Sequence, residues 1–526
     1  MKLPRFVDSW QGLGSSAFKP TKLVTHHEQY TVGETTGGLS VLFTVLCIVD
    51  LFGVFPVVAL PKSIISCGIY GVPLVLVVFG LQMYTAVLLG RSWLVAQQIA
   101  PQIGEKDRRS PYAAVAELAF GPRARRLVTF LIDATVFGAG VPNLLVASQS
   151  LQLFWWKITG GGVGVSYCVW MLLIGLLLCP VMWLGSPKDM KPLAFSSVFI
   201  VSTVAISTWT CILLDVQSPR SRGGVLDHQP GTQDFLIAYG IIAFQFDIHP
   251  MLLTIQVDMK DSTRINRAVF LGFFFTGTMF AVTTVLAAYR YGLDVDYNIL
   301  QGIPASIPLY VVSLLVTLQL CLSSAVGNSA LFQHVEDLLK IPRHFCVQRC
   351  MLRSGIVALA VFLGEAVPRF DVVMGLVGST LTGPLMFIFP PLFFLKLSYM
   401  KNYLAENDPD FPFKPKLMLS SETDVYQNGD NELSLSLSKV PRTVNGAFKS
   451  YKTFGVYEDL DVDFRAERIK WYEVALSGTV MVMGISATVV ATYVSWSDAI
   501  RYATFTPPCL VNVTAAARSF LEVTKS

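Results

Sequence analysis

The sequence predicts an all-α membrane protein with eleven transmembrane helices. Of its 526 residues, 53% are hydrophobic and only 14% are charged, and the mean hydropathy is +0.54. A soluble protein of this length needs far more polar surface. Apolar stretches of about 20 residues, the length that spans a bilayer as a helix, recur along the chain. They lie near residues 39–66, 70–98, 127–153, 164–185, 192–215, 233–257, 267–289, 307–333, 351–367, 372–396 and 470–495.

The basic residues predict the orientation of these helices. With the N-terminus in the cytoplasm, most of the 40 Lys and Arg residues fall in cytoplasmic segments, even when the long connection 398–468 is left out. Cytoplasmic loops of membrane proteins carry such an excess. The first 38 residues contain no apolar core of a cleavable signal peptide, so the first helix is expected to act as its own anchor.

The connection 398–468 and the C-terminal tail carry the predicted sites outside the membrane. The connection is rich in Asp, Asn, Ser and Lys, a composition typical of a disordered cytoplasmic loop. Its "YKTF" and "YEDL" fit a Tyr-x-x-apolar sorting pattern, which makes trafficking adaptors candidate partners. Asn512 begins the one Asn-x-Ser/Thr triplet and is the candidate glycosylation site, in a tail predicted to be extracellular or lumenal. The plasma membrane and a lysosomal or vesicular membrane both fit these features.

The first and sixth predicted helices contain helix breakers and acids at membrane depth. "CIVDLFGVFPVV" holds Asp50 and Pro56, and "FQFDIHPMLL" holds Asp247, His249 and Pro250. Proline removes a backbone donor and clashes with the preceding turn, and the freed backbone groups must be satisfied by protein, water, ion or ligand. Interruptions five helices apart are typical of an inverted repeat of five plus five helices around a central binding site.

These observations predict six segments. They are a cytoplasmic tail 1–38, a first five-helix repeat 39–216, a second repeat 217–397, the cytoplasmic loop 398–468, an eleventh, extra helix 469–496 and the outer tail 497–526.

Five ordered stretches resemble the amino acid/auxin permease family, the eukaryotic amino acid transporters with vesicular inhibitory, proton-coupled and neutral branches. They are "SPYAAVAELAFGPRARRLV" (110–128), "LLCPVMWLGSPKDMKPLAFSS" (177–197), "FQFDIHPMLLTIQVDMKD" (244–261), "AAYRYGLDVDYNILQGIP" (287–304) and "GLVGSTLTGPLMFIFPPLFFLKL" (375–397). The resemblance implies the leucine-transporter-like fold and secondary active transport of amino acids driven by a cation or a proton.

The resemblance also marks a departure in the first helix. Aligning the Leu-Pro pair of the family on Leu60 and Pro61 places Asp50 at a family Asn position. It places Val54 and Phe55, followed by a proline, where the family has a triplet of small residues. Small residues let backbone amides approach a substrate carboxylate, so these side chains are expected to change the shape of the binding site.

The candidate site residues follow from the broken helices and the resemblance. For substrate binding they are Asp50, Gly53, Val54, Phe244, Asp247 and His249, and for ion or proton coupling they are Asp50, Asp247, His249, Ser323 and Ser324. A buried carboxyl and an imidazole can each take up a proton near neutral pH, so the expected coupling ion is H⁺ rather than Na⁺. Purely structural roles remain open: the carboxyls can cap broken helices, and serines can bond their own helical turn.

Two other functions compete with transport. A transporter-like nutrient sensor with little flux fits the altered first helix and the long cytoplasmic loop. An intramembrane aspartyl protease would need two facing carboxylates, drawn from Asp50, Asp133 and Asp247, but its usual Tyr-Asp and Gly-x-Gly-Asp motifs are absent. No catalytic residue, metal site, cofactor or nucleic-acid partner is predicted, and the expected partners are an amino acid substrate and the lipid bilayer.

Overall fold

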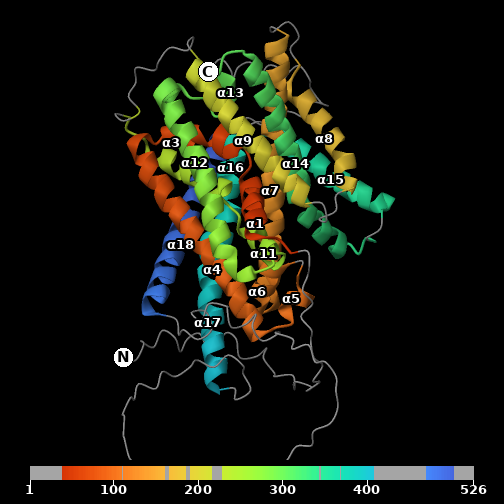
Figure 1. The fold of residues 1–526 in the computed structure, drawn as a ribbon, viewed down its shortest axis with the longest axis vertical. Helices are drawn as coiled ribbons and strands as arrows, with labels where there is room; N and C mark the ends of the chain where they lie inside the picture. The colour runs from red at the N-terminus through yellow and green to blue at the C-terminus, as the bar shows by residue number, and fades with distance from the viewer. Residues whose placement is uncertain are drawn as a thin grey trace, which may run out of the picture.

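The structure, a computed structural model, describes residues 38–108, 110–159, 165–184, 190–215, 225, 228–342, 345–367, 369–407 and 470–502. The described part is a bundle of long helices (Figure 1). The predicted tails 1–38 and 497–526, the loop 398–468 with its sorting motifs, and Asn512 lie wholly or largely outside the described residues.

The α-helices are α1 (Val41–Phe52), α2 (Phe55–Val58), α3 (Leu60–Ile65), α4 (Gly71–Ile99), α5 (Ile103–Lys106), α6 (Pro111–Phe120), α7 (Pro122–Ile158), α8 (Tyr167–Leu184), α9 (Met190–Leu214), α10 (Thr232–Gln245), α11 (His249–Val257), α12 (Ile265–Tyr291), α13 (Ile299–Gly302), α14 (Ile307–Leu338), α15 (Val347–Ala366), α16 (Phe370–Val377), α17 (Phe389–Asn407) and α18 (Trp471–Tyr502). The 3₁₀ turns are η2 (Gly68–Tyr70), η4 (Ser262–Arg264) and η5 (Gly292–Asp294), and the π-helical turns η6 (Gly378–Thr382) and η7 (Pro384–Ile388) join α16 to α17.

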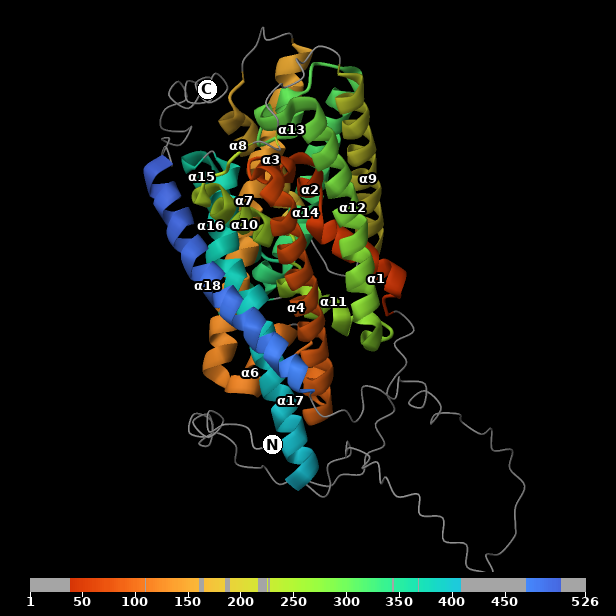
Figure 2. The ribbon, with the colours of Figure 1, turned by 90° about the vertical axis from the view of Figure 1, so that its left-hand side faces the viewer.

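The helices agree with the predicted spans in position. Nine helical stretches among the described residues are long and apolar enough to cross a membrane. Two shorter apolar helices, Val41–Phe52 and Tyr167–Trp183, lie within the first and fourth predicted spans. The all-α membrane class is therefore confirmed, whereas the number of eleven crossings and the five-plus-five repeat stay predictions. Figure 2 shows α18, from the predicted extra span, lying obliquely along α16 and α17.

The first predicted span is broken where its sequence requires it. α1 ends at Phe52, and Gly53 has φ 60° and ψ −150°, a conformation that glycine adopts without strain. A Cβ on Gly53 would lie 3.0 Å from the amide nitrogen of Gln319, so a larger residue there would also have to displace that side chain. The chain becomes helical again at Phe55, and Pro56 occupies the first turn of α2, where its missing N–H does no harm.

The sixth predicted span breaks in the same way. α10 ends at Gln245, and α11 begins at His249 with Pro250 in its first turn. Asp247, between the two helices, accepts a hydrogen bond at Oδ1 from the backbone N–H of His249 (3.1 Å). The carboxyl, one residue before the N-cap Ile248, therefore satisfies one of the amides that every helix start leaves without a partner.

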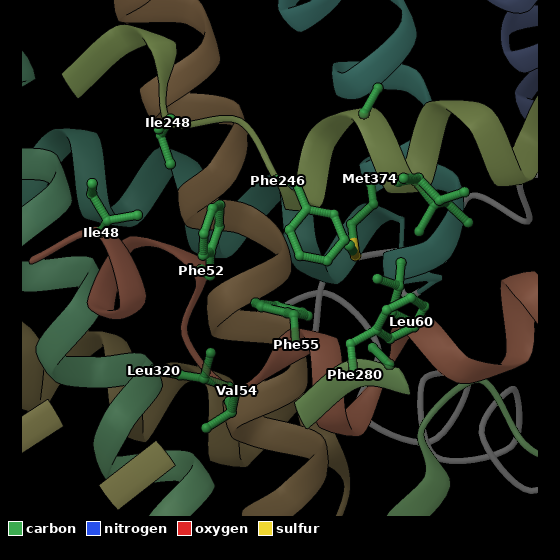
Figure 3. Packing of buried hydrophobic residues seen from close by; sticks show 14 of the residues in the cluster. Ile48, Phe52, Val54, Phe55, Leu60, Phe246, Ile248, Phe280, Leu320 and Met374 are labelled. Atoms are coloured by element: carbon green, nitrogen blue, oxygen red, sulfur yellow. The ribbon is translucent and has the colours of Figure 1, made fainter. Parts of the chain in front are cut away.

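The two breaks lie against each other. The Gln245 side chain donates a hydrogen bond through Nε2 to the carbonyl oxygen of Phe52 (2.6 Å), the last residue of α1. The Phe52 and Phe246 rings meet edge to face with centroids 5.3 Å apart, in a buried apolar cluster that surrounds both breaks (Figure 3). The interruptions that the sequence places five helices apart thus form one local structure.

The two broken helices are also joined at their other ends. Just before α1, the backbone N–H of Leu39 donates to the carbonyl of Asp258 (2.7 Å), and the N–H of Lys260 donates to the carbonyl of Leu39 (2.9 Å). These bonds form a parallel β-bridge between Leu39 and Met259, immediately after α11. The Asp258 carboxylate additionally pairs with Arg108, from the α5–α6 connection, at 2.9 Å.

Close backbone contact holds α10 against the π-helical turn η6. A Cβ on Gly378 would lie 2.0 Å from the carbonyl oxygen of Gly240. No side chain fits at this distance, so the approach of these two elements depends on a glycine at position 378. The contact positions α10, which carries Phe244 and Gln245 into the site.

Gly378→Ala is therefore expected to lower the melting temperature of the purified protein in detergent. Forcing an extra methyl group into a packed interior costs about 1–3 kcal/mol. Gly355→Ala, inside α15, is the control: a Cβ there meets nothing within 4 Å, and alanine is the better helix former. Equal melting temperatures for the two variants would contradict the prediction.

Candidate functional site

A cavity of about 130 Å³ lies at the level of the two breaks. It is enclosed by the end of α1, the start of α2, the middle of α7, the α10–α11 break and the middle of α14. One water molecule needs roughly 10–15 Å³ by this measure, so the cavity can hold several waters or a small solute. Its polar lining residues are Thr135, Asn143, Gln245, Asp247, Gln319, Ser323, Ser324 and Asn328.

Buried oxygen atoms without hydrogen-bond partners surround this cavity. Within the described residues they are Thr135 Oγ1, Gln245 Oε1, Asp247 Oδ2, Gln319 Oε1 and Ser324 Oγ. Buried polar atoms are normally paired, since leaving one without a partner costs about 1–3 kcal/mol. Five such atoms around one cavity therefore indicate a place where a hydrogen-bonding ligand or water binds.

The electrostatics of the lining favour a positive group. α1 and α10 end at the cavity, where a helix C-terminus carries a partial negative charge, and α2 and α11 begin there with the opposite partial charge, so the helix ends offset each other. Asp247 adds a carboxyl, and the described lining residues include no Lys or Arg. An ammonium group or a cation is therefore better accommodated than an isolated anion.

The structure brings most of the predicted site residues to the cavity, but not all. Gly53, Phe244, Asp247, Ser323 and Ser324 line it. The Val54 side chain instead packs in the apolar cluster, near Leu320 in Figure 3.

Phe55 is the side chain from the altered triplet that reaches the cavity wall. The sequence predicts that Val54 and Phe55 both change the shape of the binding site. Both residues pack in the buried apolar cluster, and Phe55 also lines the cavity, whereas Val54 does not.

Asp50 lies behind the cavity rather than in its wall. Its side chain is buried in α1, it interacts with Ser197 of α9, and its Oδ1 has no hydrogen-bond partner in the described structure. The Ser197 hydroxyl in turn accepts a weak hydrogen bond from Gln319 Nε2 (3.4 Å). Asp50 is thus connected to the cavity through two polar side chains.

His249 also lies behind the wall, directly behind Asp247. Its ring is 0% exposed, with Nδ1 3.2 Å from Asp247 Oδ1 and Nε2 3.1 Å from Thr85 Oγ1. Asp247 alone of the three reaches the cavity. A chain of polar groups therefore runs from α4, through the start of α11, to the binding space.

A second residue of α4 supports the same break. Gln82, one turn before Thr85, donates through Nε2 to the carbonyl of Ala243 (3.1 Å) in the last turn of α10. Sequence reasoning missed Gln82, Thr85 and Gln319. The available signal was two polar residues three positions apart, hence on one face, in the apolar stretch "FGLQMYTAVLL".

Comparison with known proteins identifies the family. The family model described as transmembrane amino acid transporter protein matches residues 38–407, most of the chain. The chain belongs to this family. Its members are transporters rather than enzymes, as the sequence predicts, and the protein is an integral membrane protein with several apolar helices.

Individual relatives of this transporter family are distant. The chain is 23% identical over 352 residues to amino acid transporter AVT1D of Arabidopsis thaliana, a match that covers 65% of this chain and 60% of the relative. It is 24% identical over 414 residues to the proton-coupled amino acid transporter-like protein pathetic of Drosophila melanogaster, covering 74% and 81% respectively. The chain thus spans about three fifths of the length of the first relative.

The fold has a counterpart among solved structures. The crystal structure of MhsT in complex with L-phenylalanine superposes with a TM-score of 0.51 at 12% identity, over 87% of this chain and 99% of MhsT. At this identity the likeness concerns the fold, and it supports the leucine-transporter-like arrangement implied by the sequence resemblance.

Asp133, the remaining aspartate at membrane depth, is partly exposed and also has a partner. It pairs with His334 across the contact between α7 and α14. Asp50, Asp133 and Asp247 thus have different neighbours, namely Ser197, His334 and His249. These contacts therefore do not pair two of the carboxylates with each other, as an aspartyl protease requires.

Gln82→Met is expected to destabilise the protein by about 1–3 kcal/mol, because it leaves the carbonyl of Ala243 buried without a donor. The measurement is the melting temperature in detergent. Gln102→Met, at an exposed position, serves as control and should stay within about 0.5 kcal/mol of the unmodified protein. A Gln82→Met protein as stable as the control would show that the side chain does not support the break.

Proposed function

We propose that the protein is a secondary active transporter that binds an amino acid between the broken helices and moves it by alternating access. The observation that carries this proposal is the set of five buried oxygen atoms around the cavity that lack partners among the described residues. An α-ammonium group brings three donors and a positive charge to such a lining. The names of the relatives and the L-phenylalanine bound to MhsT support the same class of substrate.

Proton coupling is the second part of the proposal. An amino acid brings a carboxylate close to Asp247, and two negative charges in a low-dielectric site repel each other. A proton taken up by Asp247 and His249 removes that repulsion, so proton and substrate favour each other's binding. Asp50, with a buried oxygen that lacks a described partner, is a further proton acceptor. Na⁺ is the competing ion, with Ser323 and Ser324 as its ligands.

We further propose the predicted orientation, with the N-terminus in the cytoplasm. Cys168, at the start of α8, is disulfide-bonded, and disulfides persist on the oxidising side of a membrane. This supports placing the α7–α8 connection outside the cell or in a lumen, as the basic residues predict. Glycosylation of Asn512, adaptor binding to 398–468 and the choice of plasma or lysosomal membrane belong to the same proposal.

A nutrient sensor is the second candidate function, and Phe55 is the observation that favours it. Phe55 lines the cavity at a position where the sequence resemblance places a small residue. A sensor would bind an amino acid in the same space and move little of it.

Amino acid uptake into proteoliposomes tests the main proposal. Each proteinogenic amino acid is offered with an inward proton gradient, with an inward Na⁺ gradient, and with neither. We expect saturable uptake of some amino acids and stimulation by the proton gradient. Saturable binding without uptake would indicate the sensor, and stimulation by Na⁺ alone would replace the coupling ion.

Asp50→Asn is expected to remove or weaken the stimulation by a proton gradient, because asparagine keeps the shape of the carboxyl but binds no proton. Exchange of amino acid between the two sides at equal pH should persist. Asp261→Asn is the matched control: this partly exposed carboxyl lies after α11, pairs with Arg264 at i,i+3 and accepts a hydrogen bond from the Thr263 N–H, which an asparagine oxygen can also accept. Uptake that responds equally to the gradient in both variants would exclude Asp50 from coupling.

A further inference from the structure

The Thr85 hydroxyl is placed to respond to protonation of the His249 ring. Thr85 Oγ1 lies 3.1 Å from His249 Nε2 and 3.0 Å from the carbonyl oxygen of Leu81, in its own helix. A hydroxyl carries one hydrogen and can also accept. The carbonyl oxygen of Gln82, in the same helix, is a further acceptor at 3.1 Å. The hydroxyl therefore donates either to its own helix, at Leu81 or Gln82, or to the imidazole, and these two arrangements require different numbers of protons on His249 and Asp247.

When the hydroxyl donates to its own helix, its oxygen accepts from an N–H at His249 Nε2. His249 Nδ1 then faces Asp247 Oδ1 at 3.2 Å, and a proton must lie between them, because two acceptors do not bond. Either the ring is an imidazolium beside a carboxylate, or the ring is neutral beside a protonated carboxyl. In both cases the Asp247–His249 pair holds one proton in addition to that of a neutral ring.

When the hydroxyl donates to His249 Nε2, the single ring proton is on Nδ1 and bonds the ionised Asp247. The pair has then released its extra proton. The backbone N–H of His249 donates to the same carboxyl oxygen (3.1 Å) in either state. No ring nitrogen is left unpaired in either state, although the ring is fully buried.

We propose that Thr85 is a positioning residue whose rotating hydroxyl lets the Asp247–His249 pair take up and release the coupled proton. The inference rests on the proposed proton coupling and adds a residue of α4 to it. The pair has a further titratable neighbour in Tyr112 of α6, which interacts with Asp247 and whose hydroxyl donates to the carbonyl of Leu385 at 2.5 Å. The Tyr112 hydroxyl thus donates its hydrogen to Leu385, and the hydrogen-bond partner of His249 Nε2 is Thr85.

The test compares Thr85→Val, which keeps the shape and loses the hydroxyl, with Thr85→Ser, which keeps the hydroxyl. Liposomes that contain the full-length protein are loaded with a pH-sensitive dye. The acidification of their interior that accompanies uptake of a transported amino acid is recorded at a series of external pH values. Without the hydroxyl the protonated ring loses an acceptor for a charged donor, which costs more than a neutral hydrogen bond. We expect the midpoint of the pH profile to move to lower pH by about one unit, an approximately tenfold weaker proton affinity.

Thr85→Ser should restore the profile of the unmodified protein, a rescue that a packing role for the Thr85 methyl group would not produce. Thr278→Val, whose exposed hydroxyl bonds only its own helix in α12, should leave the profile unchanged. Thr85→Ala also lacks the hydroxyl and provides a second reading of the same shift should Thr85→Val fail to fold.

The two proposals fail in different ways. If the unmodified protein moves the amino acid without acidifying the liposomes, proton coupling is wrong and the role of Thr85 falls with it. If it acidifies them and the profiles of Thr85→Val and Thr85→Ala superimpose on it, coupling stands and the inference about Thr85 is overturned.

Discussion

Backbone groups that leave a helix at bilayer depth must find partners within the protein, because lipid offers none. In this protein, side chains of α10 and α4 provide hydrogen-bond partners for backbone carbonyls at the two breaks. Gln245 donates to the last carbonyl of α1, and Gln82 of α4 donates to the last turn of α10. The position of α4, the pairing of α1 with α10, and the polar cavity between them all depend on these side-chain bonds to the carbonyls at the helix ends.

The breaks could be predicted from the sequence because their causes are local. Proline and glycine act on their own turn, and Gly53 and Pro250 end and start helices where the sequence places them. The family likeness, confirmed by the match over 38–407, likewise follows from short ordered motifs.

The side-chain contacts between helices could not be predicted from such local features. A single glutamine or threonine in an apolar helix looks the same whether it bonds its own turn or a neighbour, and only the packing of α4 against α10 and α11 distinguishes Gln82 and Thr85. Val54 and Phe55 are adjacent, apolar and both packed in the buried cluster, yet Phe55 also lines the cavity and Val54 does not. Such distinctions depend on tertiary contacts that periodicity does not encode.

The β-bridge between Leu39 and Met259 places a mechanical condition on any opening of this end of the molecule. Backbone hydrogen bonds do not depend on side-chain identity, so the two bridged segments remain coupled through most substitutions. An outward swing of the near end of α1 must either carry α11 along or break both bonds. Because α11 starts with His249, a joint movement would shift the imidazole relative to Thr85, which is fixed in α4. A movement of the Leu39–Met259 bridge would therefore change the distance between the Thr85 hydroxyl and His249 Nε2.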